Sequence, residues 1–217
     1  MRSKKDFIAA RVAKFFNPGD VVNLGIGLPT LVGKYIQKNV ILHAENGTVL
    51  YGPPPEAGKE DDDFINASGK YVTLRPGAAC FDSAISFAII RGGHLDATVL
   101  GFLEVDEKGN LANWAMPGRV VGMGGAMDLV YGARRVIICG EHVTKDGSPK
   151  ILKQCSLPLT GAGVVDVIVT DLCYIEVTKD GLVVRELAPG ITIEDVRSKT
   201  EADLIVPEEI AVMGVSA

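Results

Sequence analysis

The chain has 217 residues, enough for one large or two small domains, and its 47% hydrophobic and 23% charged residues exclude a disordered protein. Its formal net charge is −5 and no stripe of lysine and arginine is present, which argues against nucleic acid as a partner. No apolar run reaches the length of a membrane span, and Asp6, Arg11 and Lys14 interrupt the apolar segment that a secretion signal would need. We therefore expect a soluble, cytoplasmic protein with no membrane partner.

The cysteines also bear on the class of protein. Cys80, Cys139, Cys155 and Cys173 are far apart, without any Cys-x-x-Cys pair or histidines at metal-ligand spacing. This pattern predicts reduced thiols and no metal site. Because no internal repeat or linker is visible, we expect a single domain over residues 1–217.

The first predicted elements surround a glycine-rich turn. A helix capped by Ser3 precedes a strand over residues 21–26, and Gly25-Ile26-Gly27-Leu28-Pro29 then turns the chain into a helix over residues 30–36. Thr30 stands where a dinucleotide-binding fingerprint needs its third glycine, so that class of site is not predicted. Free backbone N–H groups at the start of a helix still suit a carboxylate or a phosphate.

Two interpretations compete for the next stretch. The apolar run Val40-Ile41-Leu42 leads to Glu45-Asn46-Gly47, and Thr48-Val49-Leu50-Tyr51 follows. In one interpretation Asn46-Gly47 is the tight turn of a hairpin, since both residue types tolerate positive φ, and Glu45 only flanks it. In the other, Glu45 lies at the carboxyl end of a strand, where open α/β sheets bind their ligands, and acts as a nucleophile.

An acidic loop is predicted over residues 56–70. Asp61, Asp62 and Asp63 are adjacent and cannot converge on one ion as spaced ligands do, so we expect a solvated loop without a metal. A strand is predicted over residues 71–74, and Arg75-Pro76-Gly77 is expected to end it.

The middle of the chain is apolar. Residues 81–90 predict a buried helix and residues 97–105 a continuous buried strand of the parallel type. His94, at the entrance of that strand, is expected to be a structural histidine. Asp106-Glu107-Lys108-Gly109-Asn110 is typical of a hairpin turn.

A second glycine-rich loop, Gly122-Met123-Gly124-Gly125-Ala126, precedes a short helical segment over residues 127–131. Its glycines let the main chain approach a bulky ligand, with N–H groups of the helix start facing it, although a tight connecting loop would look the same. The remaining predicted elements are a buried strand over residues 135–140, a meander over residues 164–170, 174–177 and 182–185, and a helix over residues 193–200. Together these elements predict an α/β fold, with an open, largely parallel sheet flanked by helices and a late β-meander.

Taken in order, several short motifs resemble the β subunit of the family I, or 3-oxoacid type, CoA-transferases. The similarity runs from about residue 6 to about residue 205, and the motifs that carry it are Val22-Asn23-Leu24-Gly25-Ile26-Gly27-Leu28-Pro29, Glu45-Asn46-Gly47, Ile90-Arg91-Gly92-Gly93-His94, Leu111-Ala112-Asn113-Trp114, Gly122-Met123-Gly124-Gly125-Ala126-Met127-Asp128-Leu129-Val130 and Leu157-Pro158-Leu159-Thr160. The resemblance implies a fold of the NagB/RpiA/CoA-transferase type.

The resemblance also implies site residues. Glu45 would be the catalytic nucleophile, which forms a glutamyl-CoA thioester in a ping-pong reaction. The residues expected to bind CoA or substrate are Asn23, Gly25, Gly27, Lys70, Gly124, Gly125 and Ala126. Lys70 departs from the pattern, because an ungapped count from Asn66 places Gly69 where some members have their CoA-contacting lysine.

Partners and substrates follow from the same resemblance. The family pairs this subunit with an α subunit, commonly as two α and two β subunits, so the chain alone should be inactive. No cofactor beyond the substrate CoA and no metal is implied. The favoured substrates are short-chain acids of the acetoacetate, butyrate or acetate type; the alternatives are a dicarboxylate such as 3-oxoadipate or succinate, and a non-catalytic CoA- or sugar-phosphate-binding module on the same scaffold. Ala44 and His43 replace the serine and glutamine common before the glutamate, and Tyr51-Gly52-Pro53-Pro54-Pro55 also departs from the family, so the sequence leaves the acyl specificity open.

Overall fold

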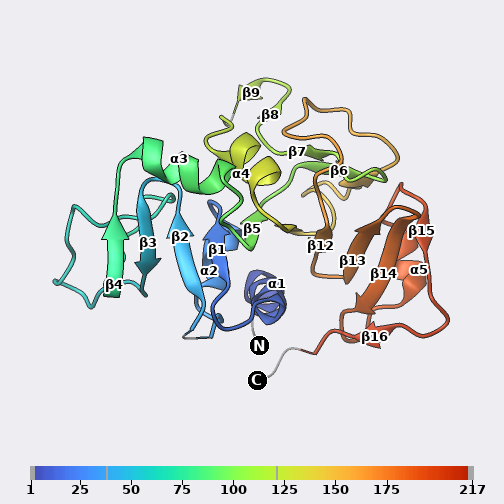
Figure 1. Ribbon diagram of the computed structural model, residues 1–217. Helices are drawn as coiled ribbons and strands as arrows, with labels where there is room; N and C mark the ends of the chain where they lie inside the picture. Colours follow the sequence, from blue (N-terminus) through green and yellow to red (C-terminus); the bar gives the residue numbers. More distant parts are fainter. Residues whose placement is uncertain (1–2, 38, 121, 215–217) are drawn as a thin grey trace.

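A computed structural model of the chain describes residues 3–37, 39–120 and 122–214 (Figure 1). Adjacent parallel strands form its centre, in the spatial order β2 (Ile41–Ala44), β1 (Val21–Leu24), β5 (Ala97–Leu100), β10 (Val136–Cys139) and β12 (Val167–Val169). β5, β10 and β12 are buried along their whole length, as continuous apolar runs between two helical layers should be. The predicted open, largely parallel sheet is confirmed.

Antiparallel strands extend this sheet at both ends. β3 (Thr48–Tyr51) pairs with β2, and β4 (Leu74–Cys80) pairs with β3 and forms one edge. At the other end β13 (Cys173–Thr178) and β14 (Gly181–Leu187) follow β12 in an antiparallel meander, which confirms the late meander. The short strands β15 (Leu204–Ile205) and β16 (Ala211–Val212) pair with β14.

Helices cover both faces of the sheet. α1 (Lys4–Val12), continued by a 3₁₀ turn (Ala13–Phe15), and α2 (Leu28–Val32) pack on one face. α3 (Ser83–Arg91), α4 (Ala126–Gly132) and α5 (Ile193–Arg197) pack against the second apolar core on the other face. Figure 1 shows α1 below the sheet, with α3 and α4 above it. The predicted cap is present, since the Ser3 hydroxyl accepts a hydrogen bond from the Asp6 N–H at 3.1 Å.

Two small sheets lie beside the main one. β6 (Glu104–Asp106) pairs with β7 (Leu111–Ala112) and β11 (Ile151–Leu152), which confirms the hairpin turn predicted between residues 106 and 110. β8 (Ala115–Met116) and β9 (Arg119–Val120) form a separate hairpin. Within the described ranges, every helix is too short or too polar to cross a bilayer.

The prediction of a strand over residues 71–74 ended by Arg75-Pro76-Gly77 is wrong. β4 begins at Leu74 and continues through Pro76 and Gly77 to Cys80. β4 lies at the edge of the sheet and its register with β3 shifts between Val49 and Tyr51. An edge strand with an irregular register accommodates a proline, because the missing N–H need not bond to a strand on the outer side.

Two further predictions need correction. The strand predicted over residues 97–105 breaks after Leu100, because the chain leaves the main sheet and Leu103 donates its N–H to Ala112 O at 3.0 Å. The helix predicted over residues 81–90 is present as α3, but it is not buried: Ser86 and Ile90 face the core while Ile85 is 51% exposed. An apolar helix with an exposed apolar face lacks a covering surface within the described part of the chain.

The single-domain prediction over residues 1–217 stays a prediction, and its extremes, residues 1–2 and 215–217, lie outside the described residues.

Candidate functional site at the end of strand β2

Glu45 follows β2 and begins the turn into β3. The turn is closed by Gly47, whose N–H donates to Ala44 O at 3.0 Å and whose φ is +119°. A Cβ on Gly47 would lie 2.0 Å from the Phe81 carbonyl oxygen, so the turn needs glycine for space as well as for φ. The two interpretations of this stretch are therefore both correct as local structure: Glu45 belongs to a hairpin turn, and that turn lies at the carboxyl end of a parallel strand.

The glycine-rich loop before α4 lies against the Glu45 carboxylate. A Cβ built on Gly125 would lie 2.3 Å from Glu45 Oε2, and one on Gly124 would lie 3.5 Å from Oε1. The N–H of Gly125 donates a hydrogen bond to the carboxylate. Only a residue without a side chain at position 125 leaves the carboxylate in this place.

Burial raises the pKa of the Glu45 carboxyl above its ordinary value. The Gly125 hydrogen bond opposes that shift, while the negative charge of Asp128 adds to it. Arg91 pairs with Asp128, with Nε 2.6 Å from Oδ1, so the second acid at the site is partly neutralised. The carboxylate is thus poorly solvated, a condition that favours its use as a nucleophile.

A cavity of about 350 Å³ opens beside Glu45. Of the residues predicted to bind CoA or substrate, it brings together Asn23, Gly25, Gly124, Gly125 and Ala126. The N–H of Gly25 is not available to a ligand, because it donates to Val99 O at 2.8 Å. The cavity otherwise has mostly apolar walls, which are formed by Ile26, Ala67, Leu100, Gly101, Phe102, Leu103, Met123 and Leu129 together with Asn113 and Gly122.

Two predicted residues lie elsewhere. Gly27 lines neither this cavity nor the larger one nearby. Lys70 lines that larger cavity, of about 440 Å³, between α2 and the loop that precedes β4. Ala67, from the same loop as Lys70, reaches the Glu45 cavity. The loop that the ungapped count pointed to therefore reaches the Glu45 cavity at Ala67, and Lys70 as a CoA contact stays a prediction.

Asn113 and Thr160 show how two of the sequence motifs meet. The Thr160 hydroxyl donates to Asn113 Oδ1 at 2.6 Å, and Asn113 Nδ2 donates to Gly101 O at 3.1 Å. Asn113 lines the cavity, and Gly101 is part of the chain that leaves the main sheet after β5. Sequence reasoning assigned no role to either side chain; the only signal was that both occur in motifs that carried the resemblance.

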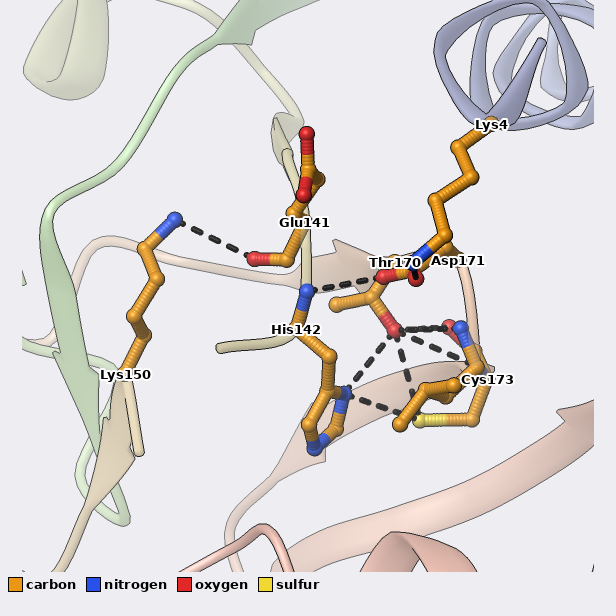
Figure 2. Close-up of polar contacts among 8 residues, drawn as sticks. Lys4, Glu141, His142, Lys150, Thr170, Asp171 and Cys173 are labelled. Carbon is orange, nitrogen blue, oxygen red and sulfur yellow. Dashed lines mark hydrogen bonds and ion pairs between the residues drawn. The ribbon is translucent and has the colours of Figure 1, made fainter. Parts of the chain in front are cut away.

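A separate polar cluster surrounds His142 at the end of β10 (Figure 2). Its ring nitrogens lie 2.9 Å from Thr170 Oγ1 and 2.9 Å from Thr200 Oγ1, and Cys173 Sγ is 3.8 Å from Nδ1. Lys4 pairs with Asp171 at 2.9 Å beside it. Both ring nitrogens are thus satisfied by threonine hydroxyls, which is typical of a structural histidine. Among the described residues, no group of three or more His, Cys, Asp and Glu side chains is placed to hold a metal ion.

The chain is similar to known proteins over nearly its whole length. A sequence profile of the family described as coenzyme A transferase matches residues 5–199. The beta subunit of the acetate CoA-transferase of Haemophilus influenzae is 50% identical over 216 residues, which are 98% of this chain and 96% of that protein. The corresponding subunit of the probable succinyl-CoA:3-ketoacid coenzyme A transferase of Bacillus subtilis is 48% identical over 213 residues, 97% of this chain and 99% of that protein.

Among solved structures, the acyl-CoA transferase YdiF of Escherichia coli O157:H7, in a thioester complex with CoA, superposes with a TM-score of 0.81 at 23% identity. The match covers 99% of this chain and 44% of that chain, so this chain spans less than half of YdiF. At that level of identity the similarity bears on the fold.

Proposed function

The chain belongs to the coenzyme A transferase family, and we propose that it is the β-type subunit that supplies the catalytic glutamate of a two-subunit enzyme. That enzyme would transfer CoA between short-chain carboxylic acids. The single observation that carries the proposal is the Glu45 carboxylate, half-buried at the wall of a cavity of about 350 Å³ and hydrogen-bonded to the N–H of Gly125. The relatives described above are themselves single subunits of CoA-transferases.

The reaction proposed for this site is a covalent, ping-pong transfer. The Glu45 carboxylate attacks the carbonyl carbon of an acyl-CoA, and the C–S bond breaks to give an acyl-glutamyl anhydride and the CoA thiolate. The thiolate then attacks the Glu45 carbonyl carbon, which forms a glutamyl-CoA thioester and releases the first acid as its carboxylate. A second carboxylate reverses both steps and leaves as the new acyl-CoA, while Glu45 returns to its starting state.

A glutamate suits this exchange because its carboxylate is the same kind of acceptor as the two substrates. Each step passes through a tetrahedral oxyanion, which needs hydrogen-bond donors nearby. The N–H of Gly125, already bonded to the Glu45 carboxylate, is the donor that this chain offers at the glutamyl carbon. The apolar walls that include Leu100, Phe102 and Leu129 would keep water from the anhydride and the thioester, both of which hydrolyse.

The proposal also requires a second protein chain. Ile85 on α3 and Tyr131 on α4 are 51% and 68% exposed, and Ile26, at the cavity, is 67% exposed. α3 and α4 pack together, and the Gly125 loop leads directly into α4, so these exposed apolar side chains lie on elements next to the site. We propose that they are covered by an α subunit, in an assembly of two α and two β subunits in the cytoplasm, and that this chain alone is inactive.

The direct test is substitution of Glu45 in the complex with the α subunit. Glu45→Ala removes the nucleophilic atom, so turnover should fall to background while folding persists. Glu45→Asp retracts the carboxylate by about 1.5 Å, from ordinary bond lengths, and such a misplacement costs on the order of a hundredfold in rate. Glu56→Ala is the matched control, because Glu56 is an exposed acid whose ion pair among the described residues is with the exposed Lys59.

The intermediate can also be trapped. The complex, incubated with acyl-CoA and no acceptor acid and then digested under mildly acidic conditions, should yield a CoA adduct on the peptide that contains Glu45. Normal turnover without such an adduct by mass spectrometry would contradict the covalent mechanism.

The substrate has two candidates. One candidate is a 3-oxoacid or acetate, and the other is a dicarboxylate such as succinate or 3-oxoadipate. Both are compatible with the relatives, because one relative is an acetate CoA-transferase subunit and the other a probable succinyl-CoA:3-ketoacid CoA-transferase subunit. Turnover of the α/β complex with a panel of monocarboxylate, 3-oxo and dicarboxylate acceptors separates the two.

A further inference from the structure

A directed chain of hydrogen bonds runs behind the Glu45 cavity. Asn23 Nδ2 lies 3.1 Å from His43 Nδ1 and 3.2 Å from the His43 carbonyl oxygen. His43 Nε2 lies 3.3 Å from Ser86 Oγ, and Ser86 Oγ donates to the Glu45 carbonyl oxygen at 2.7 Å. β1, β2 and α3 each contribute one of the three side chains, and all three residues are 1% exposed or less.

The direction of every hydrogen bond in this series is determined by the backbone carbonyl oxygens at its two ends, which can accept but cannot donate. A carbonyl oxygen only accepts, so the end of the Asn23 amide that faces His43 O must be the NH₂ group. The same NH₂ group faces His43 Nδ1, so Nδ1 accepts and the ring proton lies on Nε2. Nε2–H then donates to Ser86 Oγ, which leaves the Ser86 proton for the Glu45 carbonyl oxygen. No other arrangement of protons satisfies all four contacts.

Burial keeps the imidazole neutral, as this arrangement requires. His43 has no exposed surface, and burial lowers its pKa to about 4. An imidazolium would carry protons on both nitrogens, and its Nδ1–H would face the NH₂ group of Asn23.

The arrangement has a consequence inside the cavity. Asn23 lines the cavity, and within the described residues both hydrogen bonds of its side chain use Nδ2. Its Oδ1 is therefore the end that remains for a ligand, so the cavity wall presents a hydrogen-bond acceptor at this point.

We propose that His43 is a positioning residue: its carbonyl oxygen and Nδ1 hold the NH₂ end of the Asn23 amide, which leaves Oδ1 for the cavity, and its Nε2–H, through Ser86, holds the backbone of Glu45. The ligand group that this geometry selects is an N–H or O–H donor of the bound acyl-CoA. The inference rests on the proposed function for its kinetic consequences, whereas the tautomer itself can be measured without any activity.

The tautomer is measured on the full chain labelled with ¹⁵N-histidine. The chain contains 3 histidines, so His94→Gln and His142→Gln are sufficient to assign the signals. We expect His43 to show an unprotonated Nδ1 and a protonated Nε2 at neutral pH, while the exposed His94 serves as the solvent-averaged reference. A protonated Nδ1 at neutral pH would overturn the proposal even if Glu45 is the nucleophile.

Kinetics on the α/β complex provide the second readout. In His43→Gln the amide oxygen can accept as Nδ1 does and the amide NH₂ can donate as Nε2–H does, whereas His43→Leu has neither group. We expect His43→Leu to lower kcat/KM by on the order of tenfold to a hundredfold. KM should rise because the Asn23 amide loses a hydrogen-bond partner, and kcat should fall because the Glu45 carboxylate moves. His43→Gln should recover most of that loss. Ser86→Ala, which leaves Asn23 untouched, should lower kcat more than it raises KM.

Thr98→Val is the matched control. Thr98 lies opposite Asn23 in the neighbouring strand β5, is fully buried, and its hydroxyl has no hydrogen-bond partner within the described residues. Its removal should leave kcat and KM unchanged. If His43→Leu and Ser86→Ala behave like Thr98→Val, the positioning role is wrong. If instead Glu45→Ala retains turnover, the proposed function fails, and the ¹⁵N measurement still decides the tautomer.

Discussion

Gly125→Ala tests the site at its closest contact. The backbone of Gly125 has φ −85° and ψ 5°, which an alanine adopts without difficulty, so the substitution changes only the space beside Glu45. The new Cβ would lie 2.3 Å from Glu45 Oε2, 2.9 Å from Cδ and 3.1 Å from Phe87 Cζ. To reach an ordinary contact of about 3.4 Å, the carboxylate must withdraw by about 1 Å, since dispersion contacts between heavy atoms begin near that separation.

A displacement of this size at a reacting group costs on the order of a hundredfold in rate. We therefore expect kcat/KM of the α/β complex to fall by about that factor. The free energy of unfolding should change by less than about 1 kcal/mol, because the atoms that must move are the end of a flexible side chain. Acceptor turnover at saturating acyl-CoA measures kcat/KM for the acceptor acid, and urea denaturation of the isolated chain measures the free energy of unfolding.

Gly33→Ala is the control for this experiment. Gly33 ends α2 with φ −55°, and its added Cβ would meet Thr30 O at 3.4 Å and Leu24 Cδ1 at 3.5 Å, which are ordinary contacts. It should leave turnover unchanged. A Gly125→Ala complex that folds and turns over at the wild-type rate would refute the placement of Glu45 against this loop as the reacting geometry.

Two further predictions concern stability. Arg11 makes bonds of 2.6 and 2.7 Å to the Glu186 carboxylate and its side chain is 8% exposed, so Arg11→Met should lower the free energy of unfolding by about 3 kcal/mol, as loss of one partner of a buried pair does. Arg185→Met, which breaks an ion pair whose arginine side chain is 45% exposed, should cost less than about 1 kcal/mol in the same urea titration; equal losses would contradict this ranking. Burial lowers the pKa of His142 to about 4 from 6.5, so the unfolded chain binds the extra proton and the stability due to this group, full above pH 6.5, is lost as pH falls toward 4. The shift corresponds to about 3 kcal/mol, and urea titrations across that range should show a shallower pH dependence for His142→Gln than for the native chain; parallel curves would exclude His142 as the cause.

Local patterns in the sequence were sufficient for most of the architecture. The apolar run over residues 135–140 predicted a buried strand, because a strand buried on both faces has no polar alternation, and the run over residues 164–170 predicted the first strand of the late meander. Gly47 and the glycines before α4 predicted turns, because residues without a Cβ mark places where the chain bends or approaches another group closely. The order of these short motifs was also enough to identify the family.

The same patterns misjudged elements whose environment lies outside the local sequence. The run over residues 97–105 is apolar throughout, yet it divides between two sheets after Leu100, since burial alone does not specify a hydrogen-bonding partner. Residues 81–90 are apolar enough for a buried helix, yet Ile85 on α3 is exposed in this chain. Pro76 was expected to end a strand, and its place at the sheet edge allowed the strand to continue.

The sequence by itself thus determined the class of fold, the family and the identity of Glu45 as the residue to examine, because each depends on residue types and their spacing along the chain. Only the tertiary structure decided which loops share a cavity: it placed Gly125 against the Glu45 carboxylate, and it separated Lys70 from a site that Ala67 of the same loop reaches. It also brought Asn23, His43 and Ser86 into hydrogen-bonding distance, although they come from three elements distant in sequence. The physical reason is that hydrogen-bond direction, burial and the resulting pKa depend on atoms in contact, and the packing of the whole chain determines those contacts.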